Sequence, residues 1–133
     1  MTFVHAKDTY FSLASNDLST YTNTSQLEVT ADSHDVTTYG KDAHVFKGGL
    51  LNGTASAAGI YDNSTSAGPR KVILPLVGTN VTLVRRPEGT GSGLPVDTAN
   101  VLVLKYSETN PVADMVAWAV DLQISDTITS TFQ

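Results

Sequence analysis

Apolar side chains alternate with small or polar ones from Val116 to Ile124, and this pattern constrains the fold more than any other feature of the sequence. Successive side chains of a β-strand point to opposite faces of its sheet, so every second residue here shares one face. Asp121 and Gln123 lie on the polar face. The pattern predicts a strand with one buried face. The apolar face consists of Val116, Trp118, Val120, Leu122 and Ile124.

A second alternating segment, Asn100–Glu108, comes just before the first. Residues 107–112 join the two segments and contain Asn and Pro, which favour a turn. We therefore predict an antiparallel pair of strands and expect Leu102 and Leu104 to face the core. The alternation separates two faces, with Leu102, Leu104 and Tyr106 on one and Val101, Val103 and Lys105 on the other.

Shorter strands are predicted where β-branched residues and a period of two recur between Gly, Asn, Asp and Pro clusters. Together with the antiparallel pair they make the chain a mostly-β domain. Residues 85–97 are expected to form an exposed loop. The shorter strands are Tyr10–Ala14, Gln26–Ala31, His44–Phe46, Thr54–Tyr61 and Asn80–Arg85.

One short amphipathic helix is predicted within residues 66–80. Pro69 suits a first helical position, and Pro75 should end or kink the helix near Leu74 because its ring clashes with the preceding turn. Gly78 can terminate the segment. Residues four positions apart form the apolar face that would lie on the sheet. The helix residues expected in the core are Val72, Ile73 and Leu76.

The composition restricts the classes of protein to which the chain can belong. Its 133 residues are enough for one domain, spanning residues 1–133, and it has no cysteine for disulfides or thiolate chemistry. No signal peptide and no membrane span are predicted, so we expect synthesis and use in a cytosol. A net charge of −5 disfavours tight binding to nucleic-acid phosphates.

No motif in the sequence supports a catalytic or cofactor site. The acidic and histidine residues of segment 32–44 have no spacing typical of a metal site, and Gly89–Gly93 is followed by Leu-Pro where a phosphate-binding loop needs a helix. Arg85 and Arg86 are interpreted as a surface charge pair or a subunit contact. We expect no enzyme activity, no cofactor and no metal. The residues considered as metal ligands are Asp32, His34, Asp35, Asp42 and His44.

The polar stretch from Asp32 to Gly53 is too long for an economical connection within one domain, and the strand after it has almost no side-chain volume on either face. Such a strand depends on backbone pairing, so we predict that it joins neighbouring subunits and that the preceding loop contacts them. The predicted interface comprises Asp35, Thr38, Tyr39, Lys41, Asp42, His44, Phe46, Lys47, Thr54, Ser56, Ala58, Arg85 and Arg86.

Three segments carry a resemblance to a known family: "DVTTYGKDAHVFKGGLLNGTASAAGIYDNSTSAGPRKVILPLVG", "VTLVRRPEGTGSGLP" and "YSETNPVADMVAWAVDLQISD". Their succession resembles the tail tube (major tail) proteins of long-tailed bacteriophages, especially those of actinobacterial hosts. The resemblance implies two packed antiparallel sheets, sandwich- or barrel-like, flanked by one short α-helix. It also implies hexameric rings whose inner sheets join into one barrel around a lumen that conducts DNA.

The implied partners are further copies of the chain, other tail proteins such as the tape measure and tail terminator, and double-stranded DNA that passes without specific binding. No membrane partner is implied. The expected location is the virion tail, after assembly in the host cytoplasm. Two alternatives remain open at this point: a capsid decoration or head–tail adaptor protein, and a carbohydrate-binding β-sandwich, for which more exposed aromatic residues than Trp118 would be needed.

Overall fold

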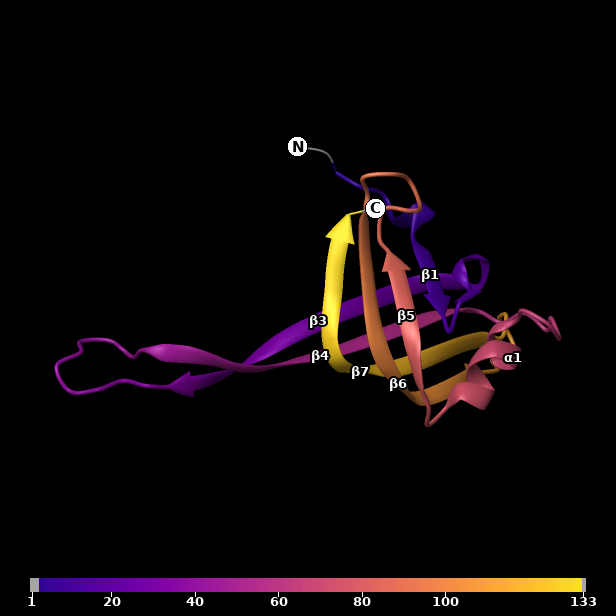
Figure 1. Cartoon of the computed structure of the whole chain (residues 1–133). Coiled ribbons are helices and arrows are strands. Elements are labelled where there is room, and N and C mark those ends of the chain that lie inside the picture. The colour runs from indigo at the N-terminus through magenta and orange to yellow at the C-terminus, as the bar shows by residue number, and fades with distance from the viewer. Residues whose placement is uncertain (1–2, 133) are drawn as a thin grey trace.

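The predicted strands belong to one continuous antiparallel sheet in the computed structural model, which describes residues 3–132. The seven strands are ordered β2-β1-β5-β6-β7-β4-β3. One short α-helix, α1 (Pro69–Ile73), lies beside the sheet (Figure 1). The mostly-β prediction with a single short helix is confirmed. The strands are β1 (Tyr10–Leu13), β2 (Asn16–Asp17), β3 (Thr22–Asp35), β4 (Phe46–Ile60), β5 (Asn80–Arg86), β6 (Pro95–Thr109) and β7 (Ala117–Phe132).

The sheet folds back on itself because two of its long strands, β6 and β7, bend (Figure 1). The β6–β7 register shifts between Ala99 and Asn100, and nearby Asp126 has a φ of 70°. A bulge of this kind bends a strand pair and lets it turn a corner. The first layer contains β2, β1, β5 and the segments of β6 and β7 beyond the bend, residues 95–99 and 128–132. The second layer contains residues 101–109 of β6, residues 117–124 of β7, β4 and β3.

Both layers and α1 contribute to one core. Trp118 is its largest member; it is 1% exposed, donates its indole N–H to the Tyr21 carbonyl at 3.0 Å and stacks on Tyr106. Gly59, directly across from Trp118 on β4, leaves no room for a Cβ because one would clash with the Tyr21 carbonyl. The other large buried side chains are Phe11, Leu13, Leu18, Ile73, Leu83, Val101, Val103, Val120 and Leu122.

The expectation for β6 is wrong at Leu104, which is 50% exposed, and Leu102 is only partly buried. The buried residues of this strand are Val101 and Val103. The β6–β7 register shifts between Val103 and Lys105, so Leu104 has no partner on β7 and the alternation changes phase. Tyr106 therefore reaches the core on the same side as Val103. The antiparallel pairing of β6 with β7 is confirmed.

Helix α1 ends where its second proline predicts. Gly68 precedes it as the N-cap and Pro69 occupies the first turn. Residues 74–76, which include Pro75, continue as a 3-10 turn, and Gly78 follows with a φ of 88°. Val72 and Ile73 are buried against the sheet, and Leu76 packs at the edge of the core. Val116, which directly precedes β7, is partly buried.

The segment expected to be a loop from Asp32 to Gly53 is largely a β-hairpin. β3 continues to Asp35 and β4 begins at Phe46, so only residues 36–45 connect them. The separate strand predicted over His44–Phe46 is wrong, because its first two residues lie in this connection. Figure 1 shows the hairpin leaving the body of the molecule as a two-stranded extension, which we call the arm (residues 29–53).

Candidate assembly interface

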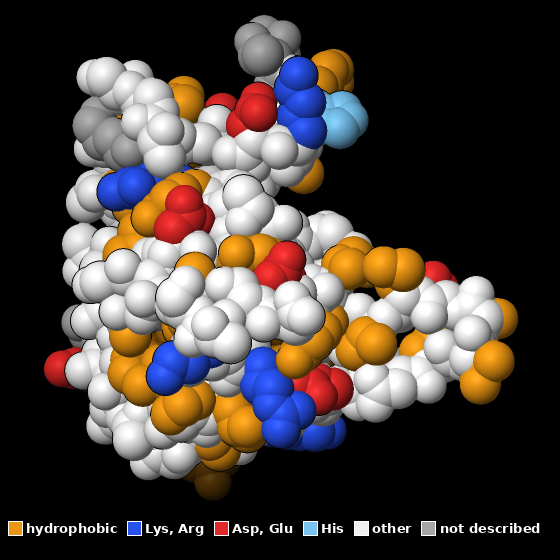
Figure 2. Space-filling model, turned by 90° about the vertical axis from the view of Figure 1, so that its right-hand side faces the viewer, with side chains coloured by type: hydrophobic (Ala, Val, Ile, Leu, Met, Phe, Trp, Pro, Cys, Tyr) orange, Lys and Arg blue, Asp and Glu red, His pale blue; other side chains and the backbone are white. Residues whose placement is uncertain are grey.

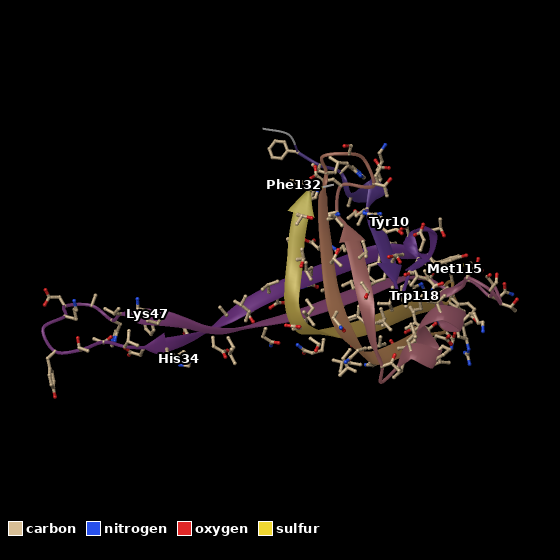
Figure 3. All side chains as sticks on the ribbon, in the orientation of Figure 1. Tyr10, His34, Lys47, Met115, Trp118 and Phe132 are labelled. Atoms are coloured by element: carbon tan, nitrogen blue, oxygen red, sulfur yellow. The ribbon has the colours of Figure 1, made fainter. Side chains whose placement is uncertain are left out.

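The arm consists of the far ends of β3 and β4, paired only with each other. β7 pairs with β4 no farther than Thr54, so nothing else in the described chain covers the ribbon beyond that point. The arm side chains point outward from the ribbon, as His34 and Lys47 illustrate (Figure 3). The exposed apolar side chains of this ribbon include Leu50 and Leu51. An isolated two-stranded ribbon is marginal in water, so the arm is suited to being completed by a partner.

Hydrogen bonds define the tip of the arm. Val36 and Val45 close it through a backbone bond of 2.8 Å, and the Val45 N–H also donates to the Thr37 hydroxyl. The Thr37 hydroxyl and backbone N–H donate to Asp35, and these bonds hold the pKa of the Asp35 carboxyl below its ordinary value. The His44 imidazole lies 3.5 Å from the same carboxyl. The tip therefore has a defined shape although it is exposed.

Most of the predicted interface residues are brought together on the arm. They are exposed, and Tyr39 has no shielding from its own chain at all. Acidic and basic residues alternate around the tip, so it presents a mixed charge beside apolar side chains. The members that the structure gathers here are Asp35, Thr38, Tyr39, Lys41, Asp42, His44, Phe46 and Lys47.

The predicted joining role of the strand over 54–61 is wrong as regards backbone pairing. Over these residues β4 pairs with β3 on one side and β7 on the other, so it lies inside the sheet. The strand carries small side chains for a different reason. Ala55 and Ala57 are buried beneath the core and leave room for larger neighbours. The residues predicted for the interface, Thr54, Ser56 and Ala58, point to the opposite, outer face.

The outer face of the second layer is small and polar. Cross-strand partners on a sheet share a face, so the register gives its rows directly. One row runs Gln26, Ser56, Asp121 and Lys105, and the next pairs Glu28 with Thr54. The neighbouring positions are mostly Thr, Ser, Ala and Gln, and the only charged residues in these rows are Glu28, Asp121 and Lys105.

Besides the two-residue edge strand β2, three unpaired strand edges within the described residues could accept another strand. The outer edge of β3 has no strand partner within the described residues, because β3 is the last strand of the sheet. Residues 105–109 of β6 and residues 128–132 of β7 each pair with one strand only. Sequence reasoning missed these edges because strand order cannot be read from alternation alone. The only sequence signal for an interface in this region was the length of the polar segment before Thr54.

Arg85 and Arg86 make contacts within their own chain. The Arg85 guanidinium lies 3.5 Å from the Asp97 carboxylate and donates to the Ser25 hydroxyl, and its side chain is largely covered. Arg86 lies over the Tyr10 ring at 4.8 Å from the ring centre. These contacts link β5 to β6, β3 and β1, which gives both arginines a structural role in the monomer.

The end of the molecule opposite the arm combines apolar and basic side chains. Leu74 and Val77 follow α1 and are 45% and 40% exposed, and Met115 at the β6–β7 turn is 66% exposed. Arg70 pairs with Glu108 at 3.0 Å, and the neighbouring Lys71 is exposed. Figure 2, which views the molecule from this end, shows basic side chains lying among hydrophobic ones.

The described residues assemble no metal centre. Within residues 3–132 no three His, Cys, Asp or Glu side chains gather closely enough to hold a metal ion. The strongest perturbation of a titratable group is at Tyr106, where burial and then the adjacent Glu108 carboxylate raise the pKa of the phenol far above its ordinary value. That hydroxyl donates to Glu108 in a contact beside the core. None of the helices in this range has the length and apolar character needed to cross a membrane.

The sequence matches no protein-family model and no curated protein, whereas the fold matches solved structures over nearly its whole length. The SPP1 tail tube has a TM-score of 0.76 at 10% identity, over 98% of this chain and 80% of that one. The virion of a native gene transfer agent gives 0.70 at 12% identity, over 97% and 99%. The tail of an empty gene transfer agent particle, with C6 symmetry, gives 0.64 at 11% identity, over 84% and 82%. The chain therefore shares the fold of these three structures.

Proposed function

We propose that this chain is a structural subunit of a bacteriophage tail tube, whose copies form stacked rings around a channel for double-stranded DNA. The observation that carries the proposal is a sheet layer with two free edges and a polar outer face. The likeness of the fold to assembled tails supports it. In this role the protein is not an enzyme, belongs to the virion tail, assembles in the host cytoplasm and meets the tape measure and tail terminator proteins. A long-tailed phage of an actinobacterial host remains our proposal for the source.

The two edges of the second layer suit ring closure. Its strands are all antiparallel in the order β6, β7, β4, β3, so β6 and β3 run in opposite directions. When copies are related by rotation, β3 of one copy meets residues 105–109 of the next in an antiparallel pairing. Closing the sheet into a barrel removes the exposed edges, which are otherwise prone to aggregation.

The outer face of the second layer would line the channel. Glu28, Asp121 and Lys105 give its central rows a net charge of −1 (two carboxylates and one ammonium). DNA carries about one negative charge per 1.7 Å of its axis. A weakly acidic channel surface of small side chains therefore gives it no binding site during ejection.

The arm and the opposite end of the molecule suit stacking of the rings. They lie at opposite ends of the molecule (Figures 1 and 3), and surfaces that pair head to tail generate an open-ended assembly. The acidic Asp35 and Asp42 of the arm complement the exposed Lys71 at the other end, where Arg70 is already paired with Glu108, and both surfaces carry exposed apolar side chains.

Electron microscopy of the purified protein tests the proposed function. We expect open-ended tubes of variable length with a central channel. A capsid decoration protein or a head–tail adaptor would instead give trimers or single closed rings, and either result would refute the tube.

Salt is expected to accelerate tube growth. Six copies with a charge of −5 give 6 × −5 = −30 for a ring with the C6 symmetry of the gene transfer agent tail. Stacking such rings brings like charges close together, and these charges repel each other. The Debye length falls from about 30 Å at 0.01 M salt to about 8 Å at 0.15 M, so diffuse repulsion is screened before close ion pairs are. Light scattering across this salt series measures the growth rate, and a rate that falls with salt would show that attractive pairs govern assembly.

The same tubes should not retain duplex DNA at any salt concentration in the series. The matched variant replaces Glu28 and Asp121 by lysine, which changes the charge of the central rows from −1 to −1 + 4 = +3 per copy. This variant is expected to retain DNA at low salt and to release it as salt rises. Tight binding of DNA by the unmodified tubes would contradict the acidic channel.

A further inference from the structure

Two opposite charges lie at the two free edges of the second layer. Glu28 belongs to β3, the last strand of the sheet, and Lys105 lies on β6 where residues 105–109 pair with β7 alone. Both side chains are exposed and both belong to the polar outer face. Within residues 3–132 neither of them forms an ion pair, although Asp121 lies across from Lys105 on β7. Both charges are therefore available to another copy of the chain.

Glu28 and Lys105 cannot pair within one chain. β4 and β7 lie between their strands, so three strand spacings, roughly 14 Å, separate the two edges. Ring closure brings the β3 edge of one copy to residues 105–109 of the next in an antiparallel pairing, which we call the seam. The two charges then lie on the same side of the seam and face the channel.

The hydrogen bonds of the sheet show which residues direct their backbone groups to the open edges. The Tyr61 N–H donates to the Val116 carbonyl at 2.8 Å, so these residues are a hydrogen-bonded pair between β4 and β7. Such pairs alternate with non-hydrogen-bonded pairs along an antiparallel ladder. Counted from this pair through the registers of the layer, the residues whose backbone groups point to the open edges are Ser25, Leu27 and Val29 on β3, and Tyr106 and Glu108 on β6.

This pattern leaves few registers for the seam. Hydrogen-bonded pairs across it must combine an outward residue of β3 with Tyr106 or Glu108, and the residues between them form non-hydrogen-bonded pairs. Lys105 is one of these intervening residues, so its partner is an outer-face residue of β3. In the regular part of the β3–β4 ladder, the candidates are Gln26, Glu28 and Thr30.

Both charge and packing favour the register that places Glu28 opposite Lys105. The ammonium then lies between this carboxylate and that of Asp121, its partner on β7. The same register pairs Leu27 with Tyr106, and each of these is partly buried against the core of its own chain. Cross-strand pairs of opposite charge, and of an apolar with an aromatic side chain, both stabilise antiparallel pairing.

The other registers lack this combination. A shift by two residues in either direction gives Lys105 a neutral partner, because Glu28 has neutral neighbours on the outer face. Asp32 would offer a carboxylate, but the β3–β4 register shifts at its position. Pairing with Asp32 would also set Glu108 against the apolar Val29.

We infer that Glu28 of each copy pairs with Lys105 of the next copy and that this pair sets the register of the seam. The inference rests on the proposed tube and names the residues that join one subunit to its neighbour within a ring. Backbone hydrogen bonds alone allow several registers, and each would give a ring of different geometry. A shift of the seam breaks the charge pair, so the pair selects one of them.

Disulfide cross-linking measures the register. The chain has no cysteine, so Glu28→Cys and Lys105→Cys each introduce one thiol. Mixed and oxidised under conditions that form tubes, these variants are expected to give a cross-linked dimer, because Cα atoms of a non-hydrogen-bonded pair lie about 4.5 Å apart. The matched controls mix Lys105→Cys with Gln26→Cys or Thr30→Cys, which are equally exposed. Diagonal positions are about 7–8 Å apart, too far for an unstrained disulfide, so we expect about tenfold less dimer from the controls.

Removing one charge tests the pair independently. Glu28→Gln is expected to slow tube growth about threefold relative to Glu88→Gln, which removes the same charge from the turn after β5. The effect is modest because an exposed ion pair contributes little free energy. Equal growth rates for these two variants would overturn the charge pair. The variant with lysine at Glu28 and Asp121 places like charges at the seam, so its tubes should grow more slowly, and its DNA retention is measured on completed tubes.

The outcomes separate the seam from the tube itself. Tubes that cross-link most strongly through a control pair, or not at all, would overturn this register and leave the tube standing. Single closed rings that cross-link through Glu28→Cys and Lys105→Cys would support the pair and refute the tube, and a protein that stays monomeric would overturn both. A dilute variant with both cysteines in one chain is expected to stay reduced. An internal disulfide in that monomer would overturn the assignment to neighbouring copies.

Discussion

Deleting Thr38–Lys47 is expected to abolish tube formation and to leave the rest of the chain folded. Ser33 pairs with Gly48 in the arm, so the deletion leaves residues 34–37 as a four-residue connection between paired strands. The removed residues are exposed and contribute nothing to the core, so thermal stability should change little. Tube growth followed by light scattering and electron microscopy is expected to fall to background, because the tip that meets the next ring is missing.

The matched control for this deletion changes another exposed connection. Replacing Thr90, Gly91 and Ser92 by alanine alters the β5–β6 loop, which is exposed and has ordinary backbone angles at these positions. This variant is expected to form tubes at the normal rate. Tubes of normal length from the arm deletion would show that the arm is dispensable and that ring stacking uses another surface.

Replacing Trp118 by alanine is expected to destabilise the monomer by roughly 3–5 kcal/mol, the usual cost of removing a large aromatic side chain from a core. The indole fills the space between the layers, and its N–H satisfies the Tyr21 carbonyl. This is a large part of the free energy of unfolding of a small domain. Thermal unfolding should show a melting temperature lower by roughly 10 °C or more.

Leu104→Ala is the matched control for the tryptophan variant. Leu104 belongs to the same layer but is half exposed at the bulge, so its truncation is expected to change stability by no more than about 0.5 kcal/mol. A larger loss for Leu104→Ala than for Trp118→Ala would mean that the assignment of the two faces is reversed.

The sequence determined the elements whose signals are local. Alternation identified β7 and its buried face with Trp118, because the strand period of two is visible wherever one face is buried and the other is polar. Pro69 and Pro75 identified both ends of α1, because proline acts on the backbone of its immediate neighbours.

Tertiary structure decided what depends on strand order and register. The bulge at Leu104 changes the phase of β6, and no residue near it differs from an ordinary strand sequence. The small residues of strand Thr54–Tyr61 predicted a strand that joins subunits. They are small because β4 crosses beneath the core between β3 and β7. Pairing partners lie far apart in the chain, so a single segment carries no information on whether it becomes a central strand or an edge.

The candidate interface divides in the same way. The interface role of the arm tip was predicted from the length and polarity of its segment, because a long polar segment is unusual within a compact domain. The free edges of β3, β6 and β7, and the apolar groove lined by Val29, Leu51 and Ile124 where the arm leaves the body, follow only from the fold. The groove exists because β7 leaves β4 after Gln123 while β4 continues into the arm with β3, and only the relative paths of two strands create an apolar face that lacks its cover.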